Sequence, residues 1–236
     1  MAHHYVLETA DALTLSYEIL ALEHKRSQSL GFETYRTTFP LLMLNASIIE
    51  GTLRFWLASS VKHEMARLIE QGTQLGKTEK DKAEQLLEKF LIEIEGSGGF
   101  EKLVSQYNFY FDISLVAKNQ GYDQEAIKAL FTLRNVLAHG TAVIAPKHPA
   151  SSPDKENYVD NWQSRLQQVN TVIFAATGTS DVYAALKDYR LPEYFFGQSK
   201  TFLKSIYAML PQHTVNAGIA YSAFTDLSFG FRGRTR

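Results

Sequence analysis

The sequence predicts an all-α protein, a helical bundle with additional helices toward its C-terminus. Apolar residues recur at helical spacing through most of the first 140 residues. Breaks that contain glycine or proline separate these stretches from one another. Hydrophobic residues make up 45% of the 236 residues and charged residues 21%, a balance that allows a globular chain of this length to bury a sizeable core.

The first two predicted helices cover residues 9–27 and 39–71. Thr37 or Thr38 could cap the second helix, and Pro40 suits its first turn because proline lacks the N–H group that a first turn leaves unpaired. Apolar residues of the second helix occupy two neighbouring sides. We therefore expect a central helix that packs against more than one neighbour.

The most apolar stretch of the chain, residues 39–60, is predicted to be a buried helix and not a membrane span. It contains Asn45, Glu50 and Arg54, and a membrane span rarely carries such groups near its middle. No basic segment followed by a long apolar run marks a signal peptide near the N-terminus. We therefore expect a soluble protein with no membrane partner.

The composition limits the chemistry and the location of the protein. The chain has no cysteine, which excludes disulfide bonds, thiolate zinc sites and cysteine nucleophiles. The same absence fits a reducing compartment, so we expect a cytoplasmic protein. The net charge is -1, from 24 lysines and arginines against 25 aspartates and glutamates. Such a charge gives no overall field toward nucleic acid, so RNA binding would depend on a local patch.

Two further helical regions are predicted before residue 120. A helix over residues 79–95 follows a capping arrangement of Thr78 and Asp81. Residues 100–118 should hold a short helix and a second helical piece. An aromatic cluster within that region could instead be partly extended; it consists of Tyr107, Phe109, Tyr110 and Phe111.

The clearest amphipathic pattern in the chain covers residues 123–139. Asp123 is a suitable N-cap for this helix, and Gly140 is well placed to end it in a left-handed conformation. The apolar positions recur three and four residues apart, as one face of an α-helix requires. They are Ala126, Ala129, Leu130, Leu133, Val136 and Leu137.

The C-terminal part has a different character. Residues 145–153 contain three prolines and are predicted to form a loop. Helices are expected at residues 158–176, 180–187 and 193–210. The remaining residues, 214–236, are rich in glycine and aromatic side chains and end in an arginine-rich sequence, for which we expect a mobile, basic tail.

The end of the 123–139 helix gathers residue types that suit the cleavage of RNA. Asn135 and His139 are four residues apart and share the face opposite the apolar stripe, while Arg134 lies roughly 140° around the helix from His139. Histidine transfers protons near neutral pH, and arginine binds two phosphate oxygens at once. Because the ribose 2′-hydroxyl can attack its own phosphodiester, no protein nucleophile and no metal is needed.

The segment Arg134-Asn135-x-x-x-His139 resembles the motif of the HEPN family, an arginine commonly followed by a polar residue, with a histidine four to six positions later. An earlier HEPN helix often carries an acidic residue, in a pattern similar to residues 45–51 around Glu50. The resemblance covers about residues 10–145 and implies an all-α bundle. We therefore expect residues 1–145 to form a HEPN-like domain. Residues 146–236 would be a helical extension packed on it.

The resemblance also implies an activity and partners. In active HEPN proteins the motif helices of two chains meet and form a composite ribonuclease site. This chain is thus expected to be a metal-independent endoribonuclease that acts on RNA as a homodimer. Arg134, Asn135 and His139 would be its site residues, and Glu50 would orient them. Many members belong to toxin–antitoxin or other defence systems, so a cognate antitoxin protein is a further expected partner.

The same residues also have simpler structural explanations. Arg134 could form a surface ion pair, and His139 could be favoured at a helix end by the helix dipole. Glu50 and Arg54 are four residues apart, the order that favours an ion pair on one helix. The whole chain could be a non-catalytic helical module for dimerisation or protein binding, or an RNA-binding protein that does not cleave. No zinc-protease spacing and no phosphate-binding glycine loop occurs, so we expect no metal and no cofactor.

Overall fold

The computed structural model of this chain is all-α, as the sequence predicts. Within the residues that it describes, every regular element is a helix. The described residues are 8–31, 35–77, 79–96, 98–117, 121–138, 169–179, 181–212 and 216–231. The predicted proline-rich loop at residues 145–153 and the first part of the helix predicted at 158–176 lie outside them, as does Thr78.

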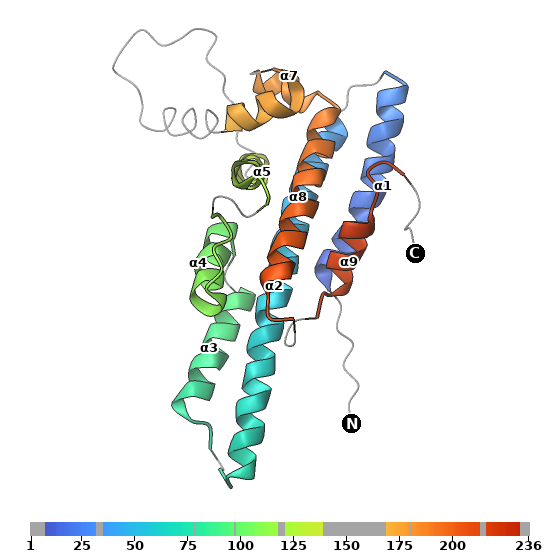
Figure 1. The fold of residues 1–236 in the computed structure, drawn as a ribbon. Helices are drawn as coiled ribbons and strands as arrows, with labels where there is room; N and C mark the ends of the chain where they lie inside the picture. The colour runs from blue at the N-terminus through green and yellow to red at the C-terminus, as the bar shows by residue number, and fades with distance from the viewer. Residues whose placement is uncertain are drawn as a thin grey trace, which may run out of the picture. The chain divides into compact units, whose positions relative to one another are not determined.

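The helices follow the predicted order, with ends that differ by a few residues (Figure 1). Residues 169–177 are also helical. They correspond to the described part of the helix predicted at 158–176. The labelled helices are α1 (Thr9–Ser29), α2 (Tyr35–Gln74), α3 (Lys82–Gly96), α4 (Phe100–Phe111), α5 (Gln124–Ala138), α7 (Val182–Leu186), α8 (Arg190–Met209) and α9 (Ile219–Asp226).

The chain forms two compact units, and each combines three separate stretches of sequence. Unit 1 comprises Met1–Thr14, Ser47–Gly121 and Leu203–Asp226, and unit 2 comprises Leu15–Ala46, Tyr122–Phe202 and Leu227–Arg236. The helices α1, α2 and α8 contribute to both units. Both units take residues from either side of residue 145.

Unit 1 is built around the second half of α2. The indole of Trp56 is fully buried, packs against Tyr207 of α8 with ring centroids 5.4 Å apart, and donates a hydrogen bond of 2.9 Å to the Ala217 carbonyl. On another side, the buried Tyr107 hydroxyl of α4 donates to the Leu53 carbonyl of α2 at 2.7 Å. Figure 1 shows α3 and α4 beside α2. The broad apolar surface predicted for α2 is thus covered by more than one helix.

Unit 2 has an aromatic centre that includes the chain after α9. Tyr17 of α1 stacks on Phe196 of α8, with ring centroids 5.7 Å apart. Phe229 packs edge-on against Tyr17 and is only 5% exposed. The expectation of a mobile tail was therefore wrong for residues 219–229, because α9 and the buried Phe229 occupy them. Residues 232–236, the basic end, lie outside the described residues.

Two predicted helix starts needed correction. The helix α2 begins at Tyr35, so Thr37 and Thr38 are buried residues within it and not its caps, and Pro40 lies inside the helix beyond its first turn. The helix α3 begins at Lys82 with Asp81 as its cap. The Asp81 carboxylate accepts a hydrogen bond from the Glu84 N–H at 2.9 Å, and the Glu84 carboxylate accepts one from the Asp81 N–H at 2.6 Å. This reciprocal pair is a capping box.

The aromatic cluster at residues 107–111 is helical and not extended. The helix α4 runs to Phe111 and ends where Asp112 adopts a left-handed conformation with a φ of 56°. Its N–H donates to the Tyr107 carbonyl and closes the helix end. Residues 113–117 contain a turn at residues 115–116 and no helix, so the second helical piece expected before residue 118 does not occur there.

Among the described residues, one helix is long and apolar enough to cross a membrane by length and composition. It comprises the 39 residues from Arg36 to Gln74 within α2. In its most apolar window, 61% of the residues are buried inside the structure. Burial of this kind is typical of a core helix. It agrees with the prediction, made from Asn45, Glu50 and Arg54, that this stretch is a buried helix.

Candidate functional site

The helix that carries the motif, α5, is fixed at its start by the predicted cap. The Asp123 carboxylate accepts hydrogen bonds from the N–H groups of Glu125 at 3.0 Å and Ala126 at 3.3 Å. Its second oxygen accepts a longer bond of 3.5 Å from the Tyr194 hydroxyl of α8, also in unit 2. The negative charge lies at the positive end of the helix dipole. Asp123 therefore stabilises α5 and links its first turn to α8.

A wide apolar face of α5 is buried, as the sequence pattern predicts. The buried set includes Ile127 and Phe131, which extend the predicted stripe around the helix, whereas Leu137 is only half-buried. This burial fixes the rotation of α5 about its axis, so the side chains opposite the stripe must point away from the core. The buried residues are Ala126, Ile127, Ala129, Leu130, Phe131, Leu133 and Val136.

Arg134 and Asn135 lie together near the C-terminal end of α5. The Arg134 Nη1–H donates a hydrogen bond of 2.9 Å to Asn135 Oδ1. Arg134 is half-buried and Asn135 is exposed, as expected for a residue at the edge of the apolar stripe and one opposite it. The amide therefore orients the guanidinium.

The third motif residue, His139, directly follows the last residue of α5, and it lies outside the described residues together with Gly140. The structure thus brings together Arg134 and Asn135, two of the three residues that the motif predicts.

Glu50 has a clear local role on α2. Its Oε1 accepts a hydrogen bond of 2.8 Å from Arg54 Nη2, and the same oxygen accepts one of 3.2 Å from the Gly99 N–H at the start of α4. Arg54 also donates to the Ile94 carbonyl in the last turn of α3. The carboxylate thus lies at a helix N-terminus and the guanidinium at a helix C-terminus, the signs that the helix dipoles favour. This pair fastens α3 and α4 to α2.

The four predicted site residues do not belong to one unit. Glu50 is in unit 1, whereas Arg134 and Asn135 are in unit 2. The contacts that Glu50 makes with Arg54 and Gly99 give the acidic residue in the pattern of residues 45–51 a structural role. Sequence spacing predicted the pair with Arg54, but not that the pair is largely buried or that it contacts two other helices.

Gln106 of α4 is a residue that the sequence did not single out. It is 4% exposed and lines a groove between α3 and α4. A glutamine in an amphipathic helix carries no recognisable sequence signal, because its burial depends on which helix packs against that turn.

Among the described residues, no group of three or more histidine, aspartate or glutamate side chains is arranged to hold a metal ion.

Comparisons with known proteins gave no match. Neither a protein family, nor a curated protein, nor a solved structure is similar to this chain at a significant level.

Proposed function

We propose that this chain is a metal-independent endoribonuclease of the HEPN type, which acts on RNA with Arg134, Asn135 and His139. The observation that carries the proposal is the contact between the Arg134 guanidinium and the Asn135 amide at the end of α5. The rotation of α5, fixed by its buried face, leaves Asn135 exposed to solvent. An oriented cation beside an exposed amide suits a phosphodiester, and His139 follows four residues after Asn135.

In the proposed reaction the ribose 2′-oxygen attacks the neighbouring phosphorus. The 2′-hydroxyl loses its proton to a base, a bond forms between the 2′-oxygen and phosphorus, and the bond to the 5′-oxygen breaks. The leaving 5′-oxygen takes a proton, and the products are a 2′,3′-cyclic phosphate and a 5′-hydroxyl. His139 would transfer one of these protons, and Arg134 would stabilise the charge on the phosphate oxygens.

A homodimer would complete the site. On an ideal helix Arg134 and His139 point roughly 140° apart, which is awkward for one phosphate. Two motif helices that meet across a two-fold axis would let each chain supply one of the two groups. Under the same proposal the protein is a cytoplasmic toxin or defence protein that cleaves RNA. A cognate antitoxin protein would inhibit it.

The test is cleavage of a labelled RNA in EDTA by the full chain. We expect wild-type protein to cleave and to leave cyclic phosphate ends. His139→Ala should lower the single-turnover rate by about 10²- to 10⁴-fold, because it removes the proton donor. Arg134→Ala should lower it by about 10²-fold or more, because it removes charge stabilisation. Lys128→Ala is the matched control. It removes a positive charge from the exposed surface of the same helix and should keep the wild-type rate at saturating RNA.

Each variant is also examined by circular dichroism, which shows whether it is folded, and by sedimentation, which gives its oligomeric state. Only rates of folded proteins of known oligomeric state are compared. Intact RNA with folded, dimeric wild-type protein would overturn the proposal and favour a non-catalytic helical module. RNA binding that weakens with salt and survives His139→Ala, without cleavage, would instead indicate an RNA-binding protein.

A further inference from the structure

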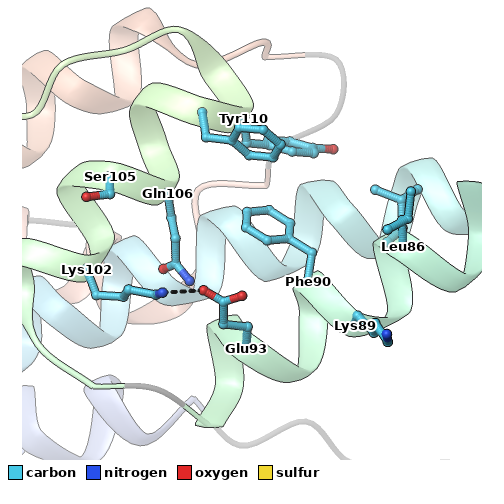
Figure 2. Close-up of a pocket in the computed structure, with 10 residues that line it drawn as sticks. Leu86, Lys89, Phe90, Glu93, Lys102, Ser105, Gln106 and Tyr110 are labelled. Carbon is cyan, nitrogen blue, oxygen red and sulfur yellow. Dashed lines mark ion pairs between the residues drawn. The ribbon is translucent and has the colours of Figure 1, made fainter.

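Unit 1 contains an apolar groove between α3 and α4, with a volume of about 510 Å³. Figure 2 shows the two helices on either side of it, with Leu86 and Phe90 from α3 and Tyr110 from α4. The volume lies within the roughly 300–1,000 Å³ that small-molecule sites occupy, and such sites are mostly apolar with a few polar groups. The groove therefore has the size and the lining of a ligand site.

The polar group in this groove is the Gln106 amide. Gln106 is only 4% exposed, and neither its Nε2 nor its Oε1 has a hydrogen-bond partner in the part of the chain that the structure describes. Figure 2 shows its side chain extending from α4 toward α3, beside Phe90. A buried amide left without partners costs about 1–3 kcal/mol for each unsatisfied group. Gln106 thus has an unpaired NH₂ group and an unpaired carbonyl oxygen, side by side, at the wall of an apolar groove.

Aromatic rings form the walls beside this amide. The Phe90 ring lies 5.5 Å from Phe109 in an edge-on arrangement and 6.0 Å from Tyr110 in a nearly parallel one, measured between ring centroids. Phe109 is 79% exposed and Leu86 is 66% exposed, so large apolar surfaces face the groove or its opening. Rings of this kind favour a flat, aromatic partner, which can stack on one ring and meet the edge of another.

Three charged side chains line the groove, Lys89, Glu93 and Lys102, and two of them form an ion pair. Lys102 of α4 forms an ion pair with Glu93 of α3, and this pair lies next to Gln106 (Figure 2). An ion pair at this position contributes no net charge, so the partner of the Gln106 amide need not be charged. Because both side chains are more than 40% exposed, the pair is of the kind that contributes little to stability, and it can shift when a ligand enters.

We propose that this groove binds a planar aromatic molecule with an uncharged amide edge, and that Gln106 recognises that edge. The ligand carbonyl would accept a hydrogen bond from Gln106 Nε2–H, and the ligand N–H would donate one to Gln106 Oε1. The ring would pack against Phe90 and its aromatic neighbours. This site uses residues of unit 1, whereas the proposed ribonuclease site uses residues of unit 2.

Benzamide is the probe that tests the proposal, because it is a flat ring with one primary amide. The full chain, labelled with ¹⁵N, is titrated with benzamide, toluene or benzoate while the side-chain NH₂ signals are followed by NMR. We expect benzamide to shift the Gln106 signal and to bind about thirtyfold more tightly than toluene, since two hydrogen bonds of about 1 kcal/mol each distinguish them. Benzoate should bind less tightly than benzamide, because its anion cannot donate to Oε1.

Two variants separate recognition by Gln106 from simple apolar binding. Gln106→Leu keeps the volume but removes the amide, and benzamide should then lose its advantage over toluene. This variant should also fold, because an apolar side chain replaces an unpaired buried amide. Asn108→Ala, at an exposed residue of the same helix that does not line the groove, should bind benzamide like the wild type. The proposal is overturned if benzamide leaves the Gln106 signal unmoved, or if Gln106→Leu binds it as well as the wild type does.

Discussion

His24 is a buried histidine whose two ring nitrogens both have partners. Its Nε2 lies 2.8 Å from the Tyr189 carbonyl oxygen, which can only accept, so Nε2 carries the proton. In the neutral ring Nδ1 then accepts from the Thr37 hydroxyl, also at 2.8 Å. The side chain is fully buried, and this burial lowers the pKa of His24 from its ordinary value. Lys25 lowers the pKa further, whereas the bond to Tyr189 and the charge of Glu193 oppose the shift.

This lowered pKa predicts a loss of stability in mild acid. Below about pH 6.5 the unfolded chain protonates His24 more readily than the folded protein does, so the free energy of unfolding must fall as the pH drops. We expect denaturant unfolding of the wild type to lose stability between pH 7.5 and pH 5.5, and His24→Gln to lose less of it over the same range. Equal losses in the two proteins would show that His24 does not contribute to this pH dependence.

At the scale of helices, the Glu50–Arg54 pair connects three elements. Arg54 bonds the end of α3, and Glu50 bonds the start of α4, while both side chains belong to α2. The side chains are 12% and 20% exposed, so the pair is shielded from solvent and salt. Removing one partner would leave the other charge partly buried and without its counter-charge. Such a change is more destabilising than the loss of an exposed pair.

Glu50→Ala should therefore lower the free energy of unfolding by about 2 kcal/mol or more. Glu95→Ala is the control, since the Lys62–Glu95 pair joins α2 to α3 but is more than half exposed, and its loss should change stability by about 0.5 kcal/mol or less. Both are measured by urea unfolding, and RNA cleavage is measured on the folded proteins. Normal stability of Glu50→Ala together with a large loss of cleavage would instead indicate that Glu50 orients the motif residues.

At the scale of the whole molecule, the chain returns to unit 2 after α9. Phe229 packs against Tyr17 and Phe196, and the Lys200 ammonium donates a hydrogen bond of 2.9 Å to the Leu227 carbonyl. Residues near the C-terminus thus complete the aromatic centre of a unit that also contains α5. The core of unit 2 depends on a segment that the sequence pattern assigned to a tail.

Phe229→Ala should lower the free energy of unfolding by about 3 kcal/mol, because it removes a large buried side chain and leaves a cavity. Phe231→Ala is a matched control only two residues away, where the ring is 67% exposed, and its effect should stay within about 0.5 kcal/mol. Thermal and denaturant unfolding of both variants give the comparison. Similar stabilities of the two variants would contradict the burial of Phe229.

Much of the secondary structure was predictable because helical periodicity is a local property. The amphipathic pattern located α5 within a residue or two, and Asp123 was identified as its cap because a cap needs only its own residue type and position. The sequence pattern was less informative where tertiary packing decides the role of a residue. Thr37 and Thr38 have the chemistry of caps, yet they are buried inside α2, where Thr37 meets His24. For the candidate site, the sequence supplied Arg134, Asn135 and His139, and the structure added the contact between the first two.

The sequence by itself determined that this protein is all-α, which side of α5 faces the core, and which residue types stand at the end of that helix. These properties follow from side chains a few residues apart, whose relation is set by the geometry of one helix. Only the tertiary structure decided that Glu50 and Arg54 join three helices, that Phe229 belongs to a core, and that Gln106 is buried without a partner. Each of these depends on surfaces that meet from distant parts of the chain, which no local pattern encodes.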